Sequence, residues 1–325
     1  MSIPSLAAAI FALLVPFAAA AQPAAGTHRL GFLSPATPSA MAARLDAFRQ
    51  ELSKLGYREG KNLTIEYRWA EGNDNRLPGL AAELARLKVA MILIHGVQAG
   101  QEVRKVSGAT PILCFTCGDV LSTGLVNSLA RPGGNITGLT SINPATSGKR
   151  IELLKEAVPG LTRVALLWNS RYPVSIPEVK DSEAAARALG LQVQSIGVSD
   201  PGEYKGAFAA MARERVQGLV ILSDATFFGR RRELAGLAQA HLIPAIAWDG
   251  ELATAGALMG YGPDALALSR RAATFVDKIL KGAKPGEIPM EQPTKFEFIL
   301  NLKTARALQL TIPRSVLLRA DQVIQ

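Results

Sequence analysis

The stretch that decides the fold class runs from Arg29 to Leu55 and reads RLGFLSPATPSAMAARLDAFRQELSKL. Its first six residues, Arg29–Ser34, form a short apolar run that is typical of a buried strand. In the remainder, apolar residues recur at spacings of four and three, the pattern of one helical face: Met41, Leu45, Phe48, Leu52 and Leu55. A buried strand followed by an amphipathic helix is the repeating unit of a parallel α/β sheet.

The same alternation of strand and helix continues to residue 139. The further strands expected there are Asn62–Arg68, Val89–Ile94, Pro111–Thr116 and Asn135–Leu139. The expected helices are one that carries Leu77, Leu80, Leu84 and Leu87 on its apolar face, one over Gln98–Ser107 and a short one over Thr123–Ala130.

A second series of similar length starts near Ser147. Its expected helices are Lys149–Ala157, Pro177–Leu189, Glu203–Arg213 and Phe227–Ala240, and its strands are Arg163–Trp168, Gln192–Val198, Gly218–Leu222 and Ile243–Ala247. The tail adds strands Ala257–Tyr261 and Phe296–Leu300, helices Ala265–Lys281 and Leu302–Leu308, and a loop over Pro285–Pro293. These few tail elements cannot form a third core, so we expect them to return to the two earlier parallel sheets across a hinge.

Composition supports two domains and limits the class of partner. The chain has 325 residues, of which 48% are hydrophobic, which is enough for two cores without a structural metal. Its net charge is +9, but Lys and Arg are scattered along the chain. We therefore expect no nucleic-acid partner, because such sites gather basic residues with aromatic ones.

The N-terminus indicates export. No charged residue precedes Arg29, and the apolar stretch Leu6–Ala21 ends in Ala19-Ala-Ala-Gln22, which fits a signal-peptidase site. At 16 residues this stretch is shorter than a membrane-spanning helix, which needs about 20. We expect residues 1–21 to be a signal peptide, although its start lacks Lys and Arg; a buried first helix is the alternative.

Ligands of open parallel sheets bind beyond the carboxyl ends of the strands, so the residues there are candidate ligand contacts. These candidates are Ser34, Gly96, Gln98, Thr116, Gly118, Asp119, Asn169, Tyr172, Ser223, Asp224, Thr226, Trp248 and Asp249. Carboxylates such as Asp119, Asp224 and Asp249 can pair with a ligand ammonium, and Tyr172, Phe227 and Trp248 can stack on an apolar group. The alternative role for each polar residue is that of a helix N-cap.

Signatures of catalysis are missing. The chain has no phosphate-binding loop, no H-E-x-x-H and no G-x-S-x-G, and no His/Cys/carboxylate cluster has metal-ligand spacing. We therefore expect neither a cofactor nor a metal. His95, at the end of the third strand, is the one candidate base, and its alternatives are a ligand contact or a packed polar residue.

Two cysteines, Cys114 and Cys117, make a C-x-x-C in the fourth expected strand. A redox pair normally opens a helix. Side chains three apart on a strand point to opposite faces. We therefore expect two unpaired cysteines, one in the core and one at the end of the strand.

Several segments resemble one family. They are Leu129-Ala-Arg-Pro-Gly-Gly-Asn-Ile-Thr-Gly138, Leu55-Gly-Tyr-Arg-Glu-Gly-Lys-Asn-Leu63, Arg150-Ile-Glu-Leu-Leu-Lys-Glu-Ala-Val-Pro159, Gly260-Tyr-Gly262 and Phe296–Leu310. Together they resemble ABC-transporter substrate-binding proteins, the group with tryptophan- and phenylalanine-binding members. The resemblance extends from about residue 29 to the C-terminus, and it adds Tyr261 to the candidate ligand-binding residues.

The resemblance implies a two-lobed type I periplasmic-binding fold with a multi-segment hinge. We expect lobe 1 to comprise residues 28–138 and about 257–285, and lobe 2 residues 139–256 and about 286–325. The implied function is a monomeric periplasmic receptor of an ABC importer. It captures an amino acid or related carboxylate and delivers it to a membrane permease and its ATPase.

Two loops depart from the family pattern. The family usually has Thr-Pro after the third strand, where this chain has His95-Gly-Val-Gln98, and Gly-Asp-Pro-Val after the fourth, where it has Gly118-Asp-Val-Leu121. The specificity for aromatic amino acids is therefore not carried over from the family. A sensor that presents its ligand to a membrane receptor is an alternative function, and an enzyme that uses His95 and Asp119 is another.

Overall fold

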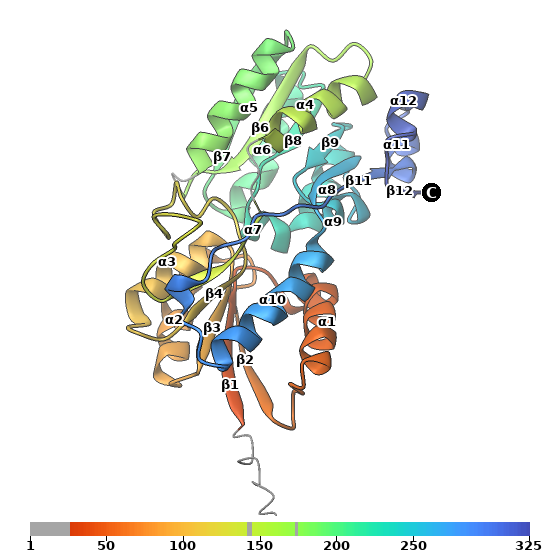
Figure 1. Cartoon of the computed structure of the whole chain (residues 1–325). Helices are drawn as coiled ribbons and strands as arrows, with labels where there is room; N and C mark the ends of the chain where they lie inside the picture. Colours follow the sequence, from red (N-terminus) through yellow and green to blue (C-terminus); the bar gives the residue numbers. More distant parts are fainter. Residues whose placement is uncertain (1–26, 142–144, 173–174) are drawn as a thin grey trace, which may run out of the picture.

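The chain forms two α/β lobes in the computed structural model, which describes residues 27–141, 145–172 and 175–325 (Figure 1). The expected signal peptide, residues 1–21, lies outside the described residues. Within the described ranges, no helix has both the length and the apolar character needed to cross a bilayer.

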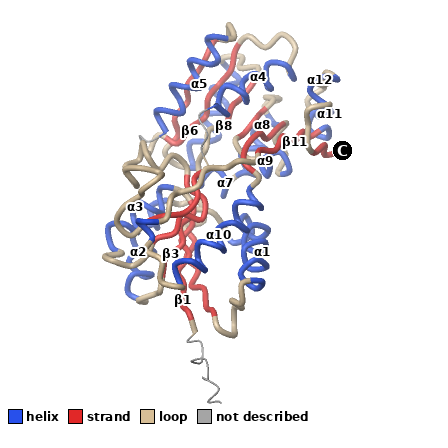
Figure 2. Tube along the Cα trace, viewed as in Figure 1, coloured by secondary structure: helices blue, strands red, loops and turns tan. Residues whose placement is uncertain are grey.

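The first lobe is built on five parallel strands in the order β2-β1-β3-β4-β5. These strands are β1 (His28–Ser34), β2 (Leu63–Trp69), β3 (Met91–His95), β4 (Ile112–Cys117) and β5 (Ile136–Thr140). Helices α1 (Pro38–Lys54) and α10 (Ala265–Leu280) cover one face, and α2 (Leu77–Arg86) and α3 (Val97–Val106) cover the other (Figure 2). Both faces are buried, because Phe32 and Leu33 enter two different apolar clusters.

The second lobe has seven strands in the order β12-β11-β10-β9-β8-β6-β7. They are β6 (Arg163–Asn169), β7 (Gln192–Val198), β8 (Gly218–Ile221), β9 (Ala245–Ala247), β10 (Met259–Pro263), β11 (Phe296–Asn301) and β12 (Gln322–Ile324). Only β11 runs antiparallel to its neighbour β10, and the other pairs are parallel.

Helices cover both faces of this second sheet. One group contains α4 (Ala145–Ala157), α5 (Ile176–Ala188), α11 (Leu302–Ala307) and α12 (Arg314–Leu317). The other contains α6 (Tyr204–Arg213), α7 (Ala225–Gly229), α8 (Arg231–Ala240) and α9 (Gly250–Thr254). The expected α/β fold with two helix-covered sheets is confirmed.

The chain passes between the lobes three times: from β5 to α4, from β10 to α10, and before β11. The expected boundaries differ from this path at two places. Residues 257–263, assigned to lobe 1, contain β10 of the second sheet, because β10 pairs with both β9 and β11. Residues 286–291, assigned to lobe 2, lie along the first sheet, where Glu291 bridges to Leu139 and Met290 N donates to Leu129 O.

Two expected helices were wrong: one is absent, and the other is divided in two. Residues 123–130 form turns rather than a helix, because Gly124 takes a φ of +65° and its N–H donates back to Leu121 O. The expected helix Phe227–Ala240 is two helices, α7 and α8, with Arg230 between them at a non-helical φ of −105°.

The expectation of two unpaired cysteines is also wrong, because Cys114 and Cys117 form a disulfide. The register of β4 against β5 shifts between these two residues, which is a β-bulge. A bulge adds a residue to the strand and turns the side chains beyond it. The two cysteines therefore reach each other, with their Cα atoms 5.6 Å apart and both side chains fully buried.

Candidate ligand-binding site

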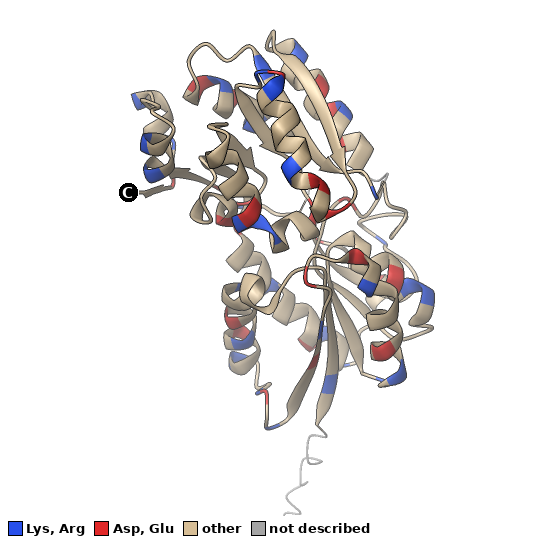
Figure 3. Cartoon of the chain, turned by 180° about the vertical axis from the view of Figure 1, so that it is seen from behind, with Lys and Arg blue, Asp and Glu red and all other residues tan. Residues whose placement is uncertain are grey.

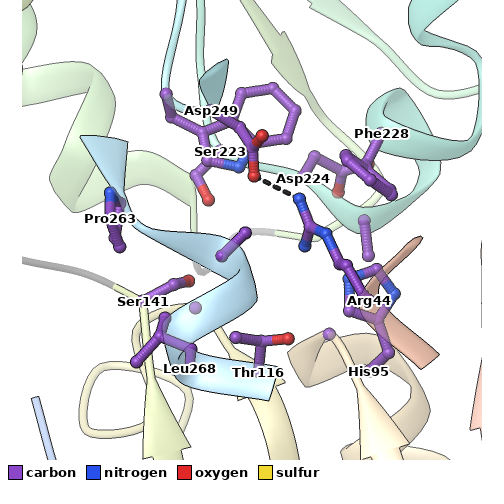
Figure 4. A pocket seen from close by; sticks show the side chains of 15 residues that line it. Arg44, His95, Thr116, Ser141, Ser223, Asp224, Phe228, Asp249, Pro263 and Leu268 are labelled. Atoms are coloured by element: carbon purple, nitrogen blue, oxygen red, sulfur yellow. Dashed lines mark hydrogen bonds and ion pairs between the residues drawn. The ribbon is translucent and has the colours of Figure 1, made fainter. Parts of the chain in front are cut away.

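The carboxyl ends of the strands in the two sheets face each other, and connected cavities lie between them. The inner cavity encloses about 460 Å³, including space open to solvent. Its walls are Arg44, His95, Gly96, Thr116, Gly118, Ser141, Ser223, Asp224, Ala225, Phe228, Trp248, Asp249, Pro263, Ala265 and Leu268 (Figure 4). Both lobes contribute, so this cavity is a cleft between them.

Two further cavities open from the same cleft. The acidic cavity is lined by Asp119, Ser141, Thr146, Ser147, Arg150, Pro177, Glu178, Asp181, Ser223 and Trp248. The joining cavity is lined by Gly96, Val97, Gln98, Gly118, Asp119, Ser175, Glu178, Ser223, Asp224 and Ala225. Ser223 lines all three cavities, which places the end of β8 at their junction.

Arg44 projects from α1 of the first lobe into the inner cavity and pairs with the second lobe. Its guanidinium donates to Asp249 Oδ2 (Figure 4). It also donates to Glu251 Oε1 over 2.7 Å. It also lies 3.9 Å above the ring of Phe228, a cation–π contact. Burial alone would lower the pKa of Arg44, but the two carboxylates outweigh burial and raise this pKa above its usual value. Arg44 is therefore a fixed cation that joins the lobes.

His95 is a neutral, packed side chain at the floor of the inner cavity. Its Nδ1 lies 3.0 Å from Ser34 Oγ, and its ring meets that of Phe228 edge to face. Burial and the charges of Arg44 and Arg231 lower the pKa of His95 to about 3. Among the described side chains, the hydrogen bond of His95 goes to Ser34 and not to Asp119, so the pair expected for an enzyme is not assembled.

Asp224 holds the centre of the cleft. Its Oδ1 caps α7 by accepting from the N–H groups of Thr226 and Phe227, at 2.8 and 2.9 Å. Its Oδ2 accepts from Gln98 of the first lobe and, over 3.1 Å, from Asn169. Burial and the nearby carboxylate of Asp74 raise the pKa of Asp224 to about 7.

A buried ion pair forms one wall of the acidic cavity. Arg150 Nη2 donates to Glu178 Oε1 over 2.7 Å and to Ser147 Oγ over 3.1 Å. Burial raises the pKa of Glu178 even though Arg150 opposes this, and Asp119 and Asp181 add to the rise. Arg150 Nε is buried and has no hydrogen-bond partner among the described residues; Thr116 Oγ1 in the inner cavity has none either. Both atoms belong to residues that line the cleft.

Most of the predicted site residues do meet in the cleft. Those that line the three cavities are Gly96, Gln98, Thr116, Gly118, Asp119, Ser223, Asp224, Trp248 and Asp249. The alternative role of helix N-cap also holds for two of them, since Asp224 caps α7 and Asp249 caps α9. Asp119 accepts from the N–H groups of Leu121 and Ser122 in a turn, so it caps no helix. Asp224 and Asp249 therefore each cap a helix and line the inner cavity.

The other predicted residues lie outside these walls. Ser34 is fully buried behind His95, and Tyr261 stacks on Phe296 within the β10–β11 pair. Asn169 and Thr226 line a separate side cavity beside Asp74. Tyr172 is near Asp74, whose charge adds to burial in raising the pKa of the phenol.

The sequence did not lead us to the charged helix residues that line the cleft, which are Arg44 on α1, Arg150 on α4, and Glu178 and Asp181 on α5. Arg44 shares the apolar face of α1 with Met41, Leu45 and Phe48, and Arg150 shares that of α4 with Ile151 and Leu154. A charge on an apolar helical face was the available signal, because such a charge is rarely buried without a partner. The expected stacking residue Phe227 packs against Tyr204 instead, and its neighbour Phe228 lines the cavity.

Known proteins with the same fold are two-lobed. A conserved domain protein of Vibrio cholerae superposes with a TM-score of 0.85 at 23% identity, covering 91% of this chain and 99% of that one. An ABC domain from Streptococcus pneumonia, in complex with L-Trp, gives 0.84 at 23% identity, covering 92% and 100%. These similarities establish the type I periplasmic-binding fold.

Sequence comparison then gives the family. The model of the ABC transporter substrate binding proteins matches residues 33–324. A tyrosine-binding protein of Clostridioides difficile (strain R20291) is 24% identical over 263 residues, covering 81% of this chain and 75% of that protein. The chain belongs to the family of ABC transporter substrate-binding proteins, which confirms the resemblance drawn from its motifs.

Proposed function

We propose that this chain is the extracytoplasmic solute-binding protein of an ABC importer. It binds a small ligand, an amino acid or related carboxylate, between its lobes. It closes around that ligand and delivers it to a membrane permease and its ATPase. It acts as a monomer in the periplasm, after a signal peptide has been removed near Ala21.

The observation that carries this proposal is the cleft, whose two walls come from different lobes and bond to each other. Arg44 pairs across it with Asp249 and Glu251, Gln98 with Asp224, and Thr226 Oγ1 donates to Asp74 Oδ1 over 2.8 Å. A ligand shifts the equilibrium between an open and a closed state only by the difference between its affinities for the two states. A solute that touches both walls gains its full contacts only in the closed state, which couples binding to a shape that a permease can recognise.

The relatives and the cleft walls support an amino acid as the ligand class. The relatives are a tyrosine-binding protein and a domain bound to L-Trp. In this chain, Thr116, Ser141 and Ser223 supply hydroxyls, and Phe228, Trp248 and Leu268 supply apolar surface. Such a mixture of apolar walls and few polar groups is typical of small-molecule sites.

A catalytic role has little support in the geometry. The one candidate base, His95, is neutral at physiological pH, and its Nδ1 faces Ser34. A general base works best when its pKa lies near the working pH. We therefore propose binding without turnover.

The test begins with the ligand that survives purification. The protein is purified without added solutes and denatured, and the released small molecules are identified by mass spectrometry. Isothermal titration calorimetry with an amino-acid and small-acid panel then gives the affinity. Reconstitution with a permease and an ATPase from the same genome separates transport from sensing. A folded protein that retains nothing and binds no member of the panel would contradict the proposal.

A further inference from the structure

The walls of the cleft are acidic, although the whole chain is basic. The three cavities are lined by the guanidiniums of Arg44 and Arg150 and by five carboxylates: Asp119, Glu178, Asp181, Asp224 and Asp249. The net charge of the chain is +9, and Lys and Arg are spread over helices of both lobes in the view of Figure 3. Residues 142–144 and 173–174, next to the cleft in sequence, carry no charged side chain. The cleft walls therefore carry a net negative charge, in contrast to the net positive charge of the whole chain.

Both guanidiniums are already neutralised by wall carboxylates. Arg44 pairs with Asp249, and Arg150 with Glu178. The other three carboxylates, Asp119, Asp181 and Asp224, have no ion pair with Lys or Arg in the described ranges. A cleft with unpaired carboxylates attracts cations, because low-dielectric walls strengthen the field inside it.

The acidic cavity brings carboxylates together from opposite lobes. Asp119 lies just beyond β4 in the first lobe, whereas Glu178 and Asp181 lie three residues apart on α5 in the second. Like charges oppose closure unless a cation lies between them. Within the described residues, no group of His, Cys, Asp or Glu converges closely enough to hold a metal ion. The cavity of about 440 Å³, part of it open to solvent, has room for an organic cation instead.

A second, independent feature indicates that this ligand also carries an acceptor. Arg150 is only 3% exposed, and its Nε has no partner among the described residues although the residue lines the acidic cavity. A buried donor without a partner is costly and needs an explanation, and a ligand acceptor at this cavity would supply one. A carboxylate fits this position, since arginine binds carboxylates well.

We propose that the ligand is an amino acid with a cationic side chain, and this inference rests on the proposed solute-binding role. One cationic group lies among Asp119, Glu178 and Asp181. The other lies beside Asp224, which the joining cavity connects to Asp119. The ligand carboxylate accepts from Arg150. The cation between Asp119 and α5 contacts both lobes only when they are closed, so it favours closure.

The test compares cationic ligands with neutral isosteres. Calorimetry on the mature chain uses L-lysine against L-norleucine and L-arginine against L-citrulline, with L-tyrosine and L-tryptophan in the same panel. We expect each cationic ligand to bind at least about tenfold more tightly than its isostere, and this ratio to shrink as salt is added.

Two variants locate the effect. Asp181→Asn removes an exposed carboxylate of the acidic cavity, and Glu183→Gln removes one from the same helix that lines none of the three cavities and pairs with Arg187. We expect Asp181→Asn to weaken lysine binding by about threefold or more, the size of a partly screened charge contact, and Glu183→Gln to leave it unchanged.

The outcomes separate the two proposals. If norleucine, tyrosine or tryptophan binds as tightly as lysine, or if Asp181→Asn does not change the lysine-to-norleucine ratio, the cationic ligand class is wrong and the solute-binding role stands. If no member of the panel binds and no solute is retained through purification, both proposals fail.

Discussion

Single residues in the cleft serve two functions at once. Asp224 caps α7 through Oδ1 and holds Gln98 of the other lobe through Oδ2. Arg44 lies within the apolar face of α1 and pairs with Asp249 across the cleft. A local role of this kind is visible in the sequence, whereas the partner on the other lobe is not.

The hydroxyl of Thr116 is buried without a partner among the described residues of the inner cavity, so we expect it to bind the ligand. Thr116→Val keeps the shape and removes the hydroxyl. Because an unsatisfied buried hydroxyl costs free energy, the ligand-free variant should be as stable as the parent or up to about 1 kcal/mol more stable. Its ligand affinity should fall by about tenfold, which corresponds to about 1.4 kcal/mol. Thermal unfolding and calorimetry measure the two effects.

Ser182→Ala is the matched control for this change. Ser182 Oγ is also buried without a partner among the described residues, but Ser182 lines none of the three cavities. The ligand affinity of Ser182→Ala should equal that of the parent. A Thr116→Val protein that binds as tightly as the parent would show that the hydroxyl does not contact the ligand.

Gly229, at the end of α7, is packed against the other lobe. A Cβ at this position would lie 2.9 Å from Ala36 Cα, which is backbone of the first lobe. We expect Gly229→Ala to hinder closure and to lower ligand affinity by about tenfold or more, since overpacking typically costs about 1–3 kcal/mol. Calorimetry of this variant and of Gly236→Ala tests this.

Gly236 lies in α8, and a Cβ there would meet nothing within 4 Å. Gly236→Ala should therefore raise stability by about 0.5–1 kcal/mol through helix propensity and leave affinity unchanged. If Gly229→Ala binds the ligand as tightly as Gly236→Ala, the lobes in solution do not approach each other as closely as Gly229 and Ala36 do in this structure.

Among the elements, β4 shows how a local irregularity positions the site. The bulge between Cys114 and Cys117 lets the disulfide form, and Thr116 and Gly118 beside it line the inner cavity. Cys117 O accepts from both the N–H and the hydroxyl of Ser141, which is also a wall residue. The end of this strand is thus tied to the first crossing between the lobes.

The disulfide has a direct chemical test. Protein exported to the periplasm of an expression host with a signal peptide, denatured without a reductant and treated with an alkylating agent should gain no mass. After reduction it should gain two adducts, because the chain has two cysteines. Disulfides persist in oxidising compartments, so the same protein made in the cytosol should be alkylated directly. Two adducts on the unreduced periplasmic protein would contradict the pairing.

In the molecule as a whole, carboxylates of the two lobes lie close together across the cleft. Asp74 of the first lobe accepts from Thr226 beside Asp224 of the second. Burial raises the pKa of Asp74, although Thr226, Arg171, Asn169 and Tyr172 oppose this, and burial with Asp74 raises the pKa of Asp224 to about 7. The protonated forms are therefore favoured when the two lobes are in contact, as they are in this structure.

Closure should depend on pH, with the closed state favoured by acid. Both pKa values exceed those of exposed aspartates, about 3.9, so the closed state binds more protons than the open one. The contribution of these protons to closure should be fully present near pH 4 and lost as pH rises through about 7. Small-angle scattering between pH 5 and 8.5 should show the radius of gyration increasing with pH.

Asp74→Asn keeps an acceptor for Thr226 and removes the charge, so the scattering profile of this variant should change less with pH. A radius of gyration that is constant with pH in the parent, or that falls as pH rises, would contradict this account.

Most of the strands and helices are predictable from the sequence alone, because apolar spacing is a local property that each element carries by itself. The family is predictable too, through motifs such as Leu129–Gly138. Nine of the fourteen candidate site residues line the cleft. They could be found without knowledge of the packing, since the strand ends of a parallel sheet share one edge and ligands bind there.

The remaining features depend on how the whole chain packs. An apolar strand such as β10 fits either sheet, and its pairing with β9 and β11 selects the second. The bulge that joins the cysteines and the helix charges that reach the cleft, Arg44 and Arg150, also depend on neighbours far away in the chain. Local patterns show which face of an element is buried. The partner that covers this face is set by the tertiary structure, because burial free energy carries no direction of its own.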